Sequence, residues 1–480
     1  MSGHPVNEPI LGYEPGSSER ETLQAELDRQ MGEVVEIPCI INGEKVFTGN
    51  TATQVIPHKH GHVIANVHLA GKAEIAAACQ AAIDAQPAWI DMGLEARCAI
   101  FERCAELLAG DWRMKVNAAT MLNQSKTVYQ AEIDAACELI DFWNFNCHYA
   151  REFHDRYQPL VSPPGVNNST EIRPLEGFVL AITPFNFSSI AANLPSAPAV
   201  LGNTAVWKPS RNSYHSNYAL MELMMEAGLP AGVINFVPSS GPDISEVCLS
   251  NPDFGGVHFT GSTAVFQGLW QRIAEALPSL RSYPRIVGET GGKDFVVAHP
   301  DCDEQGLLVA LLRGSFEYQG QKCSAASRAY VPKSVWGRMG GPLCDEVRKI
   351  TMGDARDFTN FMTAVIDQRA FDKITGYIER AQASDCCDVV VGGGYDDSVG
   401  WFIEPTIIVT SDPNYESMVE EIFGPVLTLF VYEDDDFEDV LKICDEASPY
   451  ALTGSIFATQ EEDVQTAFNA LRFTAGNFYI

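Results

Sequence analysis

Features that direct a protein into or across a membrane are missing from this sequence. No segment approaches the roughly 18 consecutive apolar residues that a membrane span requires. The N-terminal segment, MSGHPVNEPILGYEPGSSERE, contains neither an apolar signal core nor an Arg-rich amphipathic presequence. We therefore expect no membrane partner and a cytoplasmic protein, with the mitochondrial matrix as the alternative location.

Positive charge and paired cysteines are also scarce. The chain has 32 Lys and Arg against 63 Asp and Glu, a formal net charge of −31. Because binding to phosphate backbones depends on clustered Lys and Arg, this balance predicts no nucleic-acid partner. The 13 cysteines are odd in number, scattered from Cys39 to Cys444 and never spaced as Cys-x-x-Cys, so we expect reduced thiols in a reducing compartment.

Two common nucleotide-binding fingerprints are absent. No Gly-x-Gly-x-x-Gly follows any of the predicted strands, which argues against an ordinary Rossmann site. GETGGK at 288–293 is similar to a phosphate loop, but its glycine spacing is one residue short and Asp294 stands where Ser or Thr is required. The sequence therefore disfavours a kinase or a nucleoside triphosphatase.

Metal ligands are sparse as well. His58, His60 and His62 alternate, so on a strand their side chains would share one face and a metal site must be considered. No carboxylate or cysteine partner lies nearby, and an exposed turn is the favoured interpretation. We expect no bound metal.

The 480 residues that are present suffice for two or three domains, and their pattern changes along the chain. Residues 36–48 predict a hairpin that turns at Asn42-Gly43. Residues 71–150 carry apolar residues at helical spacing. From residue 177 onward, short apolar runs alternate with helical segments, which predicts an α/β fold with parallel, doubly wound sheets.

Polar residues follow three of the predicted strands, at 183–186, 208–210 and 260–262. Doubly wound sheets bind ligands at this carboxyl edge, so these residues are candidates for a nucleotide site, although strand ends are often polar in any case. Gly261-Ser262 precedes a predicted helix, whose free N–H groups and dipole would favour a pyrophosphate. Lys208 would be placed to donate to ribose hydroxyls.

Cys323 is the candidate nucleophile, because it follows a Gly- and Gln-rich turn between a predicted helix and a predicted strand in FEYQGQKCSA. Lys322 beside it would lower the pKa of the thiol, whereas most buried cysteines are inert packing residues. Asn186 stands between two phenylalanines, where its amide needs a partner such as an oxyanion. Glu289 has the setting of a partly buried base with a raised pKa, or of a loop carboxylate that binds backbone N–H groups.

Six motifs occur in an order and at separations similar to those of the aldehyde dehydrogenase superfamily. They are TPFNF (183–187), VWKPS (206–210), FTGS (259–262), GETGGK (288–293), GQKCSA (320–325) and EEIFGPV (420–426). The resemblance extends from about Pro38 to the last residue. QAEIDAACELIDFWNFN (130–146) and AGNFYI (475–480) most closely resemble the branch that oxidises L-glutamate γ-semialdehyde, the hydrolysed form of Δ1-pyrroline-5-carboxylate, to L-glutamate in proline catabolism.

The resemblance implies NAD as cofactor and an aldehyde dehydrogenase-like fold of two doubly wound α/β domains with a projecting β-hairpin arm. Its implied segments are an N-terminal extension (1–35), an NAD-binding domain (36–155 and 175–286), an oligomerisation hairpin (156–174) and a catalytic domain (287–480). Ser210 stands where many NAD-dependent relatives carry an acidic residue, so NADP stays an alternative.

The resemblance also implies roles for single residues. Cys323 would attack the aldehyde to form a thiohemiacetal, whose oxyanion would be held by Asn186 and the Cys323 N–H. After hydride transfer to NAD, Glu289 would activate the water that hydrolyses the thioester. The implied cofactor contacts are Thr183, Phe185, Lys208, Ser210, Gly261, Ser262, Glu421 and Phe423. The implied substrate contacts are Ser324, Phe187, Lys322 and Glu138.

Members of the superfamily continue for several tens of residues beyond the strand that AGNFYI forms. The added segment supplies a loop that anchors the amino-acid end of the substrate, a second aromatic wall and strands used in dimer formation, and this sequence lacks it. With that segment intact, a homodimer is expected. Two other functions stay open at this point: a dehydrogenase for another semialdehyde, such as succinate semialdehyde, and a catalytically silent NAD-binding relative.

Overall fold

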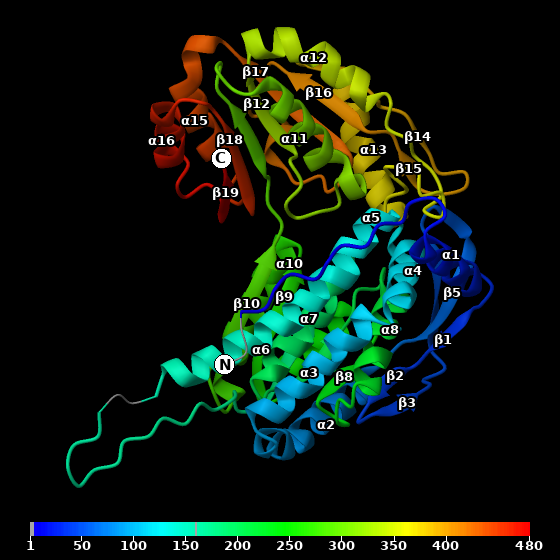
Figure 1. The fold of residues 1–480 in the computed structure, drawn as a ribbon, viewed down its shortest axis with the longest axis vertical. Coiled ribbons are helices and arrows are strands. Elements are labelled where there is room, and N and C mark those ends of the chain that lie inside the picture. The colour runs from blue at the N-terminus through cyan, green and yellow to red at the C-terminus, as the bar shows by residue number, and fades with distance from the viewer. Residues whose placement is uncertain (1–3, 159–160) are drawn as a thin grey trace. The chain divides into compact units, whose positions relative to one another are not determined.

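The computed structural model describes residues 4–158 and 161–480. Residues 1–3 of the expected N-terminal extension and residues 159–160 of the expected arm lie outside the described residues. The chain divides into two compact units, whose elements are labelled in Figure 1. Unit 1 is Met1–Val55, His62–Gln124 and Val128–Glu289, and unit 2 is Ile56–Gly61, Ser125–Thr127 and Thr290–Ile480.

Helices make up much of unit 1. They are α1 (Ser18–Met31), α2 (Lys72–Asp91), α3 (Leu94–Ala109), α4 (Arg113–Gln124), α5 (Val128–Ala131), a π-helical turn (Glu132–Cys137), α6 (Glu138–Arg156), α7 (Ser188–Val200), α8 (Tyr214–Glu226), α9 (Gly241–Leu249) and α10 (Thr263–Ala276). α1 and α9 each follow a serine, Ser17 and Ser240, whose side chain accepts a hydrogen bond from the first turn. The helical region predicted at 71–150 is confirmed.

The strands of unit 1 form a seven-stranded sheet of order β10-β9-β6-β7-β8-β2-β3. They are β2 (Cys39–Ile41), β3 (Glu44–Val46), β6 (Phe178–Ile182), β7 (Thr204–Lys208), β8 (Ile234–Phe236), β9 (Phe254–Gly261) and β10 (Arg285–Thr290). β6 pairs in parallel with β7 and with β9. β2 and β3 pair antiparallel on either side of Asn42-Gly43, which confirms the predicted hairpin.

Helices cover both faces of this sheet. Successive residues of a strand point to opposite faces, and on β7 Val206 packs into an apolar core with α2, α9 and α10. Trp207 packs into a second core with α3, α6, α7 and α8. The predicted doubly wound α/β fold is therefore confirmed for this unit. A smaller sheet of order β1-β5-β4 is formed by β1 (Val35–Ile37), β4 (Thr51–Ile56) and β5 (Lys59–His68).

Unit 2 contains a second seven-stranded sheet, of order β13-β16-β17-β12-β11-β18-β19. Its strands are β11 (Phe295–Ala298), β12 (Arg328–Pro332), β13 (Cys387–Val391), β16 (Thr406–Thr410), β17 (Val426–Tyr432), β18 (Thr453–Phe457) and β19 (Asn477–Tyr479), beside a short pair, β14 (Tyr395–Asp396) and β15 (Phe402–Ile403). Its helices are α11 (Glu304–Phe316), α12 (Lys333–Val347), α13 (Gln368–Gln382), α14 (Glu416–Val419), α15 (Phe437–Glu446) and α16 (Glu461–Ala470).

This sheet is parallel except at β13, which pairs antiparallel with β16. On β11, Val296 packs with α11 and α12, and Val297 packs with α15 and α16, so this sheet also has helices on both faces. The apolar residues of SRAYVPKSVW (327–336) predict one strand after Cys323, and this prediction is wrong in its second half. The strand ends at Pro332, which has no N–H to continue the ladder, and α12 begins at Lys333.

Residues 161–174 contain no helix or strand and extend away from the helices of unit 1 (Figure 1). They connect α6 to β6, and the β-hairpin predicted at 156–174 is not formed by the described residues of this segment, because Arg156 ends α6 and residues 161–174 contain no strand. Among the described residues, no helix has the length and the apolar content needed to cross a membrane.

Candidate active site

Thr183 follows β6 and is fixed to the neighbouring strand. Trp207 Nε1–H donates to Thr183 Oγ1 at 3.0 Å, and the Thr183 N–H donates to the Lys208 carbonyl oxygen at 3.2 Å. The two bonds hold the carboxyl ends of β6 and β7 together. The structure therefore brings two predicted cofactor residues, Thr183 and Lys208, to the edge of the sheet where doubly wound folds bind ligands.

Lys208 lines a cavity of about 410 Å³ in unit 1. Pro242 of α9 and Val265, Leu269 and Arg272 of α10 also line it. Burial, and secondarily the charge of Arg211, lowers the pKa of Lys208 to about 8. Apolar walls with one amine suit an adenine base and its ribose hydroxyls. The residues present therefore fit the adenosine half of NAD.

The start of α10 suits a phosphate. Ser262 is its N-cap, the Ser262 side chain makes no capping bond, and the first turn contains no acidic residue. The first N–H groups of a helix have no acceptor within the helix and attract anions. A Cβ on Gly261 would lie 2.8 Å from the Phe259 ring, so glycine is the residue that fits at this position. Ser210 follows β7 and lies in a turn, in which its carbonyl oxygen accepts a hydrogen bond from the Ser213 N–H.

The segment after Thr183 carries the predicted oxyanion donor. Asn186 is 4% exposed. Phe187 is the N-cap of α7 and is buried, whereas Phe185 is partly exposed. Glu138, the first residue of α6, accepts a hydrogen bond from Ser189 Oγ in the first turn of α7. Two predicted substrate residues of unit 1, Phe187 and Glu138, therefore meet at the start of α7.

Glu289 lies in β10, and the residue is exposed. Desolvation of its carboxyl group nonetheless raises its pKa above the ordinary value. The direction of the shift agrees with the prediction of a base, because a higher pKa makes a carboxylate a better proton acceptor. The Glu289 side chain is more open to solvent than its apolar strand suggested, but the shift in pKa is that of a partly desolvated carboxyl group.

The nucleophile loop of unit 2 begins in an unusual backbone conformation. After α11, the 3-10 turn Glu317–Gly320 contains Tyr318 at φ +50° and Gln319 at φ +56°. Residues other than glycine rarely adopt such angles, and surrounding contacts must hold them there. Cys323 follows three residues after Gly320, before β12. The predicted position between a helix and a strand is confirmed.

Hydrogen bonds from one side chain hold this turn. Gln319 Nε2 donates to Ser125 O at 3.1 Å, to Thr363 Oγ1 at 3.0 Å and to Ala364 O at 2.8 Å, and Gln319 Oε1 accepts from the Thr363 N–H at 3.1 Å. A Cβ on Gly320 would lie 2.2 Å from the Gly424 carbonyl oxygen, so only glycine fits there. The backbone that leads into Cys323 is thus fixed on several sides.

Lys322 and Ser324 flank the nucleophile. Lys322 Nζ lies 3.7 Å from Glu317 Oε2, so part of its charge is offset before it acts on the thiol. Ser324 is exposed, and its carbonyl oxygen accepts from Thr453 Oγ1 at 3.4 Å. The Ser324 hydroxyl is therefore open to solvent, as a residue that contacts substrate requires.

Exposure separates Cys323 from most other thiols. All 13 cysteines are free, and only Cys323, Cys386 and Cys387 are not buried. Cys386 and Cys387 lie at the start of β13 with their sulfur atoms 3.9 Å apart. Cys323 is the accessible thiol next to a cation and a fixed turn, which is the setting expected of a reactive cysteine.

Glu421 is held against the glycine motif of unit 2. The Gly292 N–H donates to Glu421 Oε1 at 3.3 Å, and a Cβ on Gly291 would lie 2.1 Å from the same oxygen. Burial raises the pKa of Glu421, and the charge of Lys373 opposes the shift. Phe423 follows with φ +61°. The structure therefore brings Glu421 to the motif at 288–293 and fixes Phe423 in a strained loop beside it.

The three alternating histidines do not form a common site. His58 Nδ1 lies 2.8 Å from Ser125 Oγ, His60 Nε2 lies 2.8 Å from Asp397 O, and His62 Nε2 lies 3.0 Å from Met31 O. The expectation of an exposed turn is wrong for His58, which is 3% exposed because its ring bonds Ser125. Each ring has its own partner in the protein.

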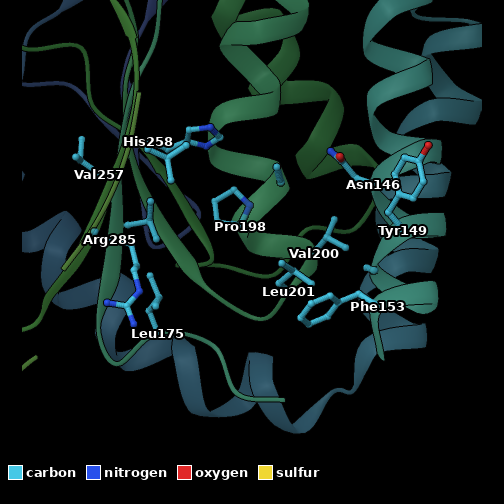
Figure 2. Close-up of a pocket in the computed structure, with 15 residues that line it drawn as sticks. Asn146, Tyr149, Phe153, Leu175, Pro198, Val200, Leu201, Val257, His258 and Arg285 are labelled. Atoms are coloured by element: carbon cyan, nitrogen blue, oxygen red, sulfur yellow. The ribbon is translucent and has the colours of Figure 1, made fainter. Parts of the chain in front are cut away.

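A further cavity of unit 1, about 430 Å³, is lined by α6, α7, β9 and β10. Figure 2 shows Phe153 of α6 beside Leu201, with His258 and Arg285 on the strand side. None of the predicted catalytic, cofactor or substrate residues lines it.

Several residues around these sites were not predicted. Val265, Leu269 and Arg272 recur at helical spacing after the FTGS motif, and that spacing was a usable signal for the lining of the cavity at Lys208. No local sequence signal could have identified Gln319 or Lys373, because the partners of their side chains lie far away in the sequence.

Comparison with known proteins covers nearly the whole chain. The model of the aldehyde dehydrogenase family matches residues 47–480. A protein of Dictyostelium discoideum named mitochondrial delta-1-pyrroline-5-carboxylate dehydrogenase is 48% identical over 478 residues, which are 99% of this chain and 86% of that protein. The human protein of the same name is 44% identical over 476 residues, which are 99% of this chain and 84% of that protein.

Solved structures agree with these matches. The delta-pyrroline-5-carboxylate dehydrogenase of Mycobacterium tuberculosis bound with NAD has a TM-score of 0.95 at 49% identity, covering 99% of this chain and 87% of that one. The 1-pyrroline-5-carboxylate dehydrogenase of Thermus with bound NAD has a TM-score of 0.92 at 28% identity, covering 100% of this chain and 91% of that one.

Proposed function

The chain belongs to the aldehyde dehydrogenase family, and from this membership we propose that it is an NAD-dependent L-glutamate γ-semialdehyde dehydrogenase. It oxidises the open-chain aldehyde derived from Δ1-pyrroline-5-carboxylate to L-glutamate in proline catabolism. The observation that carries the proposal is the loop of Cys323: an accessible thiol on a backbone fixed by Gln319, in a chain whose relatives are named for this reaction.

The cofactor is NAD, which accepts a hydride when bound. In unit 1, the cavity at Lys208 would take its adenosine, and the start of α10 at Ser262 would bind its pyrophosphate. Thr183, Phe185, Ser210 and Gly261 are assigned to the same half of the cofactor. In unit 2, Glu421 and Phe423 would hold the nicotinamide half.

Cys323 supplies the nucleophile. Its thiolate bonds to the aldehyde carbon, and the carbonyl oxygen becomes an oxyanion that Asn186 and the Cys323 N–H stabilise. Loss of hydride from that carbon leaves a thioester on Cys323. Glu289 then takes a proton from water, whose oxygen attacks the thioester, releasing the carboxylic acid and restoring the thiolate. The raised pKa of Glu289 supports its role as the proton acceptor.

Four residues are assigned to the substrate. Ser324, exposed beside the nucleophile, would donate to the carboxylate of the semialdehyde. Phe187 would pack against its aliphatic part. Lys322 and Glu138 would complement the charges of its amino-acid end.

A homodimer is the proposed assembly. Tyr149 and Phe153 on α6 and Tyr157, the residue that follows this helix, recur every four residues and are 51%, 46% and 55% exposed. An exposed apolar stripe of this kind, beside the cavity of Figure 2, suits an interface with a second copy. Light scattering of the purified protein should give twice the chain mass of 52.5 kDa, and Phe153→Glu should shift it toward a single chain.

The reaction needs a compartment that supplies NAD and keeps the thiol reduced. We propose the cytoplasm, with the mitochondrial matrix, named for the relatives of Dictyostelium discoideum and human, as the alternative.

Substrate identity is tested by comparing aldehydes that differ in one group. Initial rates of NAD reduction should be at least about tenfold higher, as kcat/KM, with Δ1-pyrroline-5-carboxylate than with succinate semialdehyde, because only the open-chain aldehyde formed from the former carries an α-amino group. Faster turnover of succinate semialdehyde would contradict the assignment of the substrate and leave the aldehyde dehydrogenase chemistry intact.

A further inference from the structure

Two short segments from the N-terminal half of the chain belong to unit 2. They are Ile56–Gly61, where β4 joins β5, and Ser125–Thr127, which follows α4. We propose that His58, in the first segment, is a positioning residue for Cys323: its ring fixes Ser125, and the segment that Ser125 begins holds the turn that leads into Cys323. The effect on turnover rests on the proposed function, whereas the effect on the reactivity of the thiol does not.

The His58 ring is buried against Ser125. The side chain of His58 is 1% exposed, and its Nδ1 lies 2.8 Å from Ser125 Oγ. The His58 N–H donates to the same oxygen at 3.1 Å. The Ser125 hydroxyl can therefore accept from this N–H and donate its own proton to Nδ1, and this assignment leaves the imidazole proton on Nε2.

The other ring nitrogen of His58 lies near a carboxylate. Among the described residues Nε2 has no well-aligned hydrogen bond, but it lies 3.3 Å from Asp354 Oδ1. Burial alone would raise the pKa of Asp354, but its contacts with His58 and Arg356 lower the pKa below its usual range, so Asp354 is charged. The negative charge favours the proton on Nε2, which keeps Nδ1 an acceptor for Ser125.

The segment that Ser125 begins contacts both residues of positive φ in the turn before Cys323. Ser125 is itself 0% exposed and has φ +53°, so surrounding bonds must hold it in place. Its carbonyl oxygen accepts from Gln319 Nε2 at 3.1 Å, and Lys126 Nζ lies 4.4 Å from the centre of the Tyr318 ring. A shift of Ser125 would therefore reach the turn at Tyr318 and at Gln319.

Alkylation of Cys323 by iodoacetamide tests the inference on the purified full chain, without cofactor or substrate. Mass spectrometry of the Cys323 peptide measures the rate, so other accessible thiols do not contribute. In His58→Ala we expect this rate to change at least about threefold, because the reactivity of a thiol depends on its surroundings. An unchanged rate in folded His58→Ala would overturn the proposal.

Steady-state kinetics of His58→Ala give a second readout. We expect kcat to fall about tenfold while the KM for NAD stays within about twofold of the parent, as for a small displacement of the reacting group alone. A raised KM with an unchanged kcat would overturn the proposal. Failure of the parent to reduce NAD would contradict the proposed function and leave the alkylation result to decide the role of His58.

His60→Ala is the matched control. His60 lies two residues away, and its Nε2 lies 2.8 Å from the Asp397 carbonyl oxygen. The variant should leave the alkylation rate and kcat unchanged. A change as large as that of His58→Ala would assign the effect to the whole segment and overturn the role of His58.

A double variant tests whether His58 acts through Ser125. In a Ser125→Ala background, adding His58→Ala should change the alkylation rate less than about 1.5-fold, because the interaction is already lost. Independent effects would multiply, and that result would overturn the proposed path.

Conservative variants test the same bond in a filled site. His58→Asn keeps an acceptor near the position of Nδ1, whereas His58→Gln keeps an amide near that of Nε2. The alkylation rate of His58→Asn should be closer to that of the parent, and equal rates or the reverse order would overturn the role of the Ser125 bond. Urea unfolding shows which variants are folded, and this pair decides the question if His58→Ala is not.

Discussion

Gln319 Nε2 donates to the carbonyl oxygen of Ser125 at 3.1 Å, across 194 positions of the chain. Both residues have positive φ, +56° for Gln319 and +53° for Ser125. Each conformation is unfavourable alone, and the bond between them helps to hold both. The geometry of the loop that carries Cys323 therefore depends on a segment that is remote in the sequence.

Replacing Gln319 should disturb the nucleophile without touching it. In Gln319→Leu the Ala364 carbonyl oxygen loses the Gln319 donor and the Ser125 carbonyl oxygen retains Thr363 Oγ1, so the turn before Cys323 is held by fewer bonds and is free to relax. We expect kcat to fall about 10- to 100-fold, as for a small displacement of a reacting group. The rate of Cys323 alkylation by iodoacetamide, which needs neither NAD nor substrate, should change as well.

The matched control is Gln305→Leu on α11, whose side chain is exposed. It should keep the parental kcat and alkylation rate. Gln319→Asn, which keeps an amide, should retain more activity than Gln319→Leu. Equal alkylation rates in Gln319→Leu and the parent would show that the turn does not set thiol reactivity.

Gly291 is predicted to be essential for cofactor binding. A Cβ there would lie 2.1 Å from Glu421 Oε1 and would displace the carboxylate assigned to the nicotinamide half. Gly291→Ala should therefore raise the KM for NAD at least about tenfold. Gly341→Ala in α12 meets no atom within 4 Å and should leave the KM unchanged. A normal KM in Gly291→Ala would contradict the role of Glu421.

NAD binding should weaken as pH rises through about 8, the pKa to which burial lowers Lys208. Below this pH the amine is charged and attracts the phosphates of the cofactor, and above it the charge is lost. Kd for NAD, measured by titration calorimetry from pH 7 to 9.5, should rise several-fold. Lys208→Arg stays charged throughout and should flatten this dependence. An equally steep dependence in Lys208→Arg would assign it to another group.

The Arg113–Glu132 ion pair should dominate the stability of the helical part of unit 1. Their side chains are 3% and 0% exposed, and Arg113 also donates to Pro9 O at 2.7 Å. Arg113→Met leaves Glu132 buried without its charge partner and should lower the free energy of unfolding by about 3–5 kcal/mol. Urea denaturation measures this loss.

An exposed pair provides the comparison for Arg113→Met. Arg103 and Glu106 have side chains 55% and 68% exposed, and Arg103→Met should cost less than about 1 kcal/mol. If both variants lost the same free energy of unfolding, burial of the Arg113–Glu132 pair would not increase its contribution to stability.

The strands and helices between residues 177 and 276 could be predicted because their apolar patterns are local. Buried parallel strands such as β6 carry continuous apolar runs, and helices such as α10 carry apolar residues at helical spacing. The order of strands in each sheet was not predicted, because it is set by packing between elements that are distant in the chain. The extension of the strand prediction past Pro332 failed because proline ends a ladder.

The motifs predicted which residues make up the candidate site. They did not predict the hydrogen bonds that hold those residues in place. No local pattern gives Tyr318 and Gln319 positive φ, since neither is glycine; bonds to Ser125, Thr363 and Ala364 impose it. The exposure of Glu289 was missed because an apolar strand next to it suggested burial.

Formation of a thioester at Cys323 is the central claim, and the rate of NADH formation tests it most directly. Absorbance at 340 nm, followed with Δ1-pyrroline-5-carboxylate and NAD, should rise with the parent protein and with Cys387→Ser, which removes another accessible thiol. In Cys323→Ser the rate should fall at least about 10³-fold, because an alcohol at its normal pKa is a poor nucleophile. A parental rate in Cys323→Ser would contradict the account.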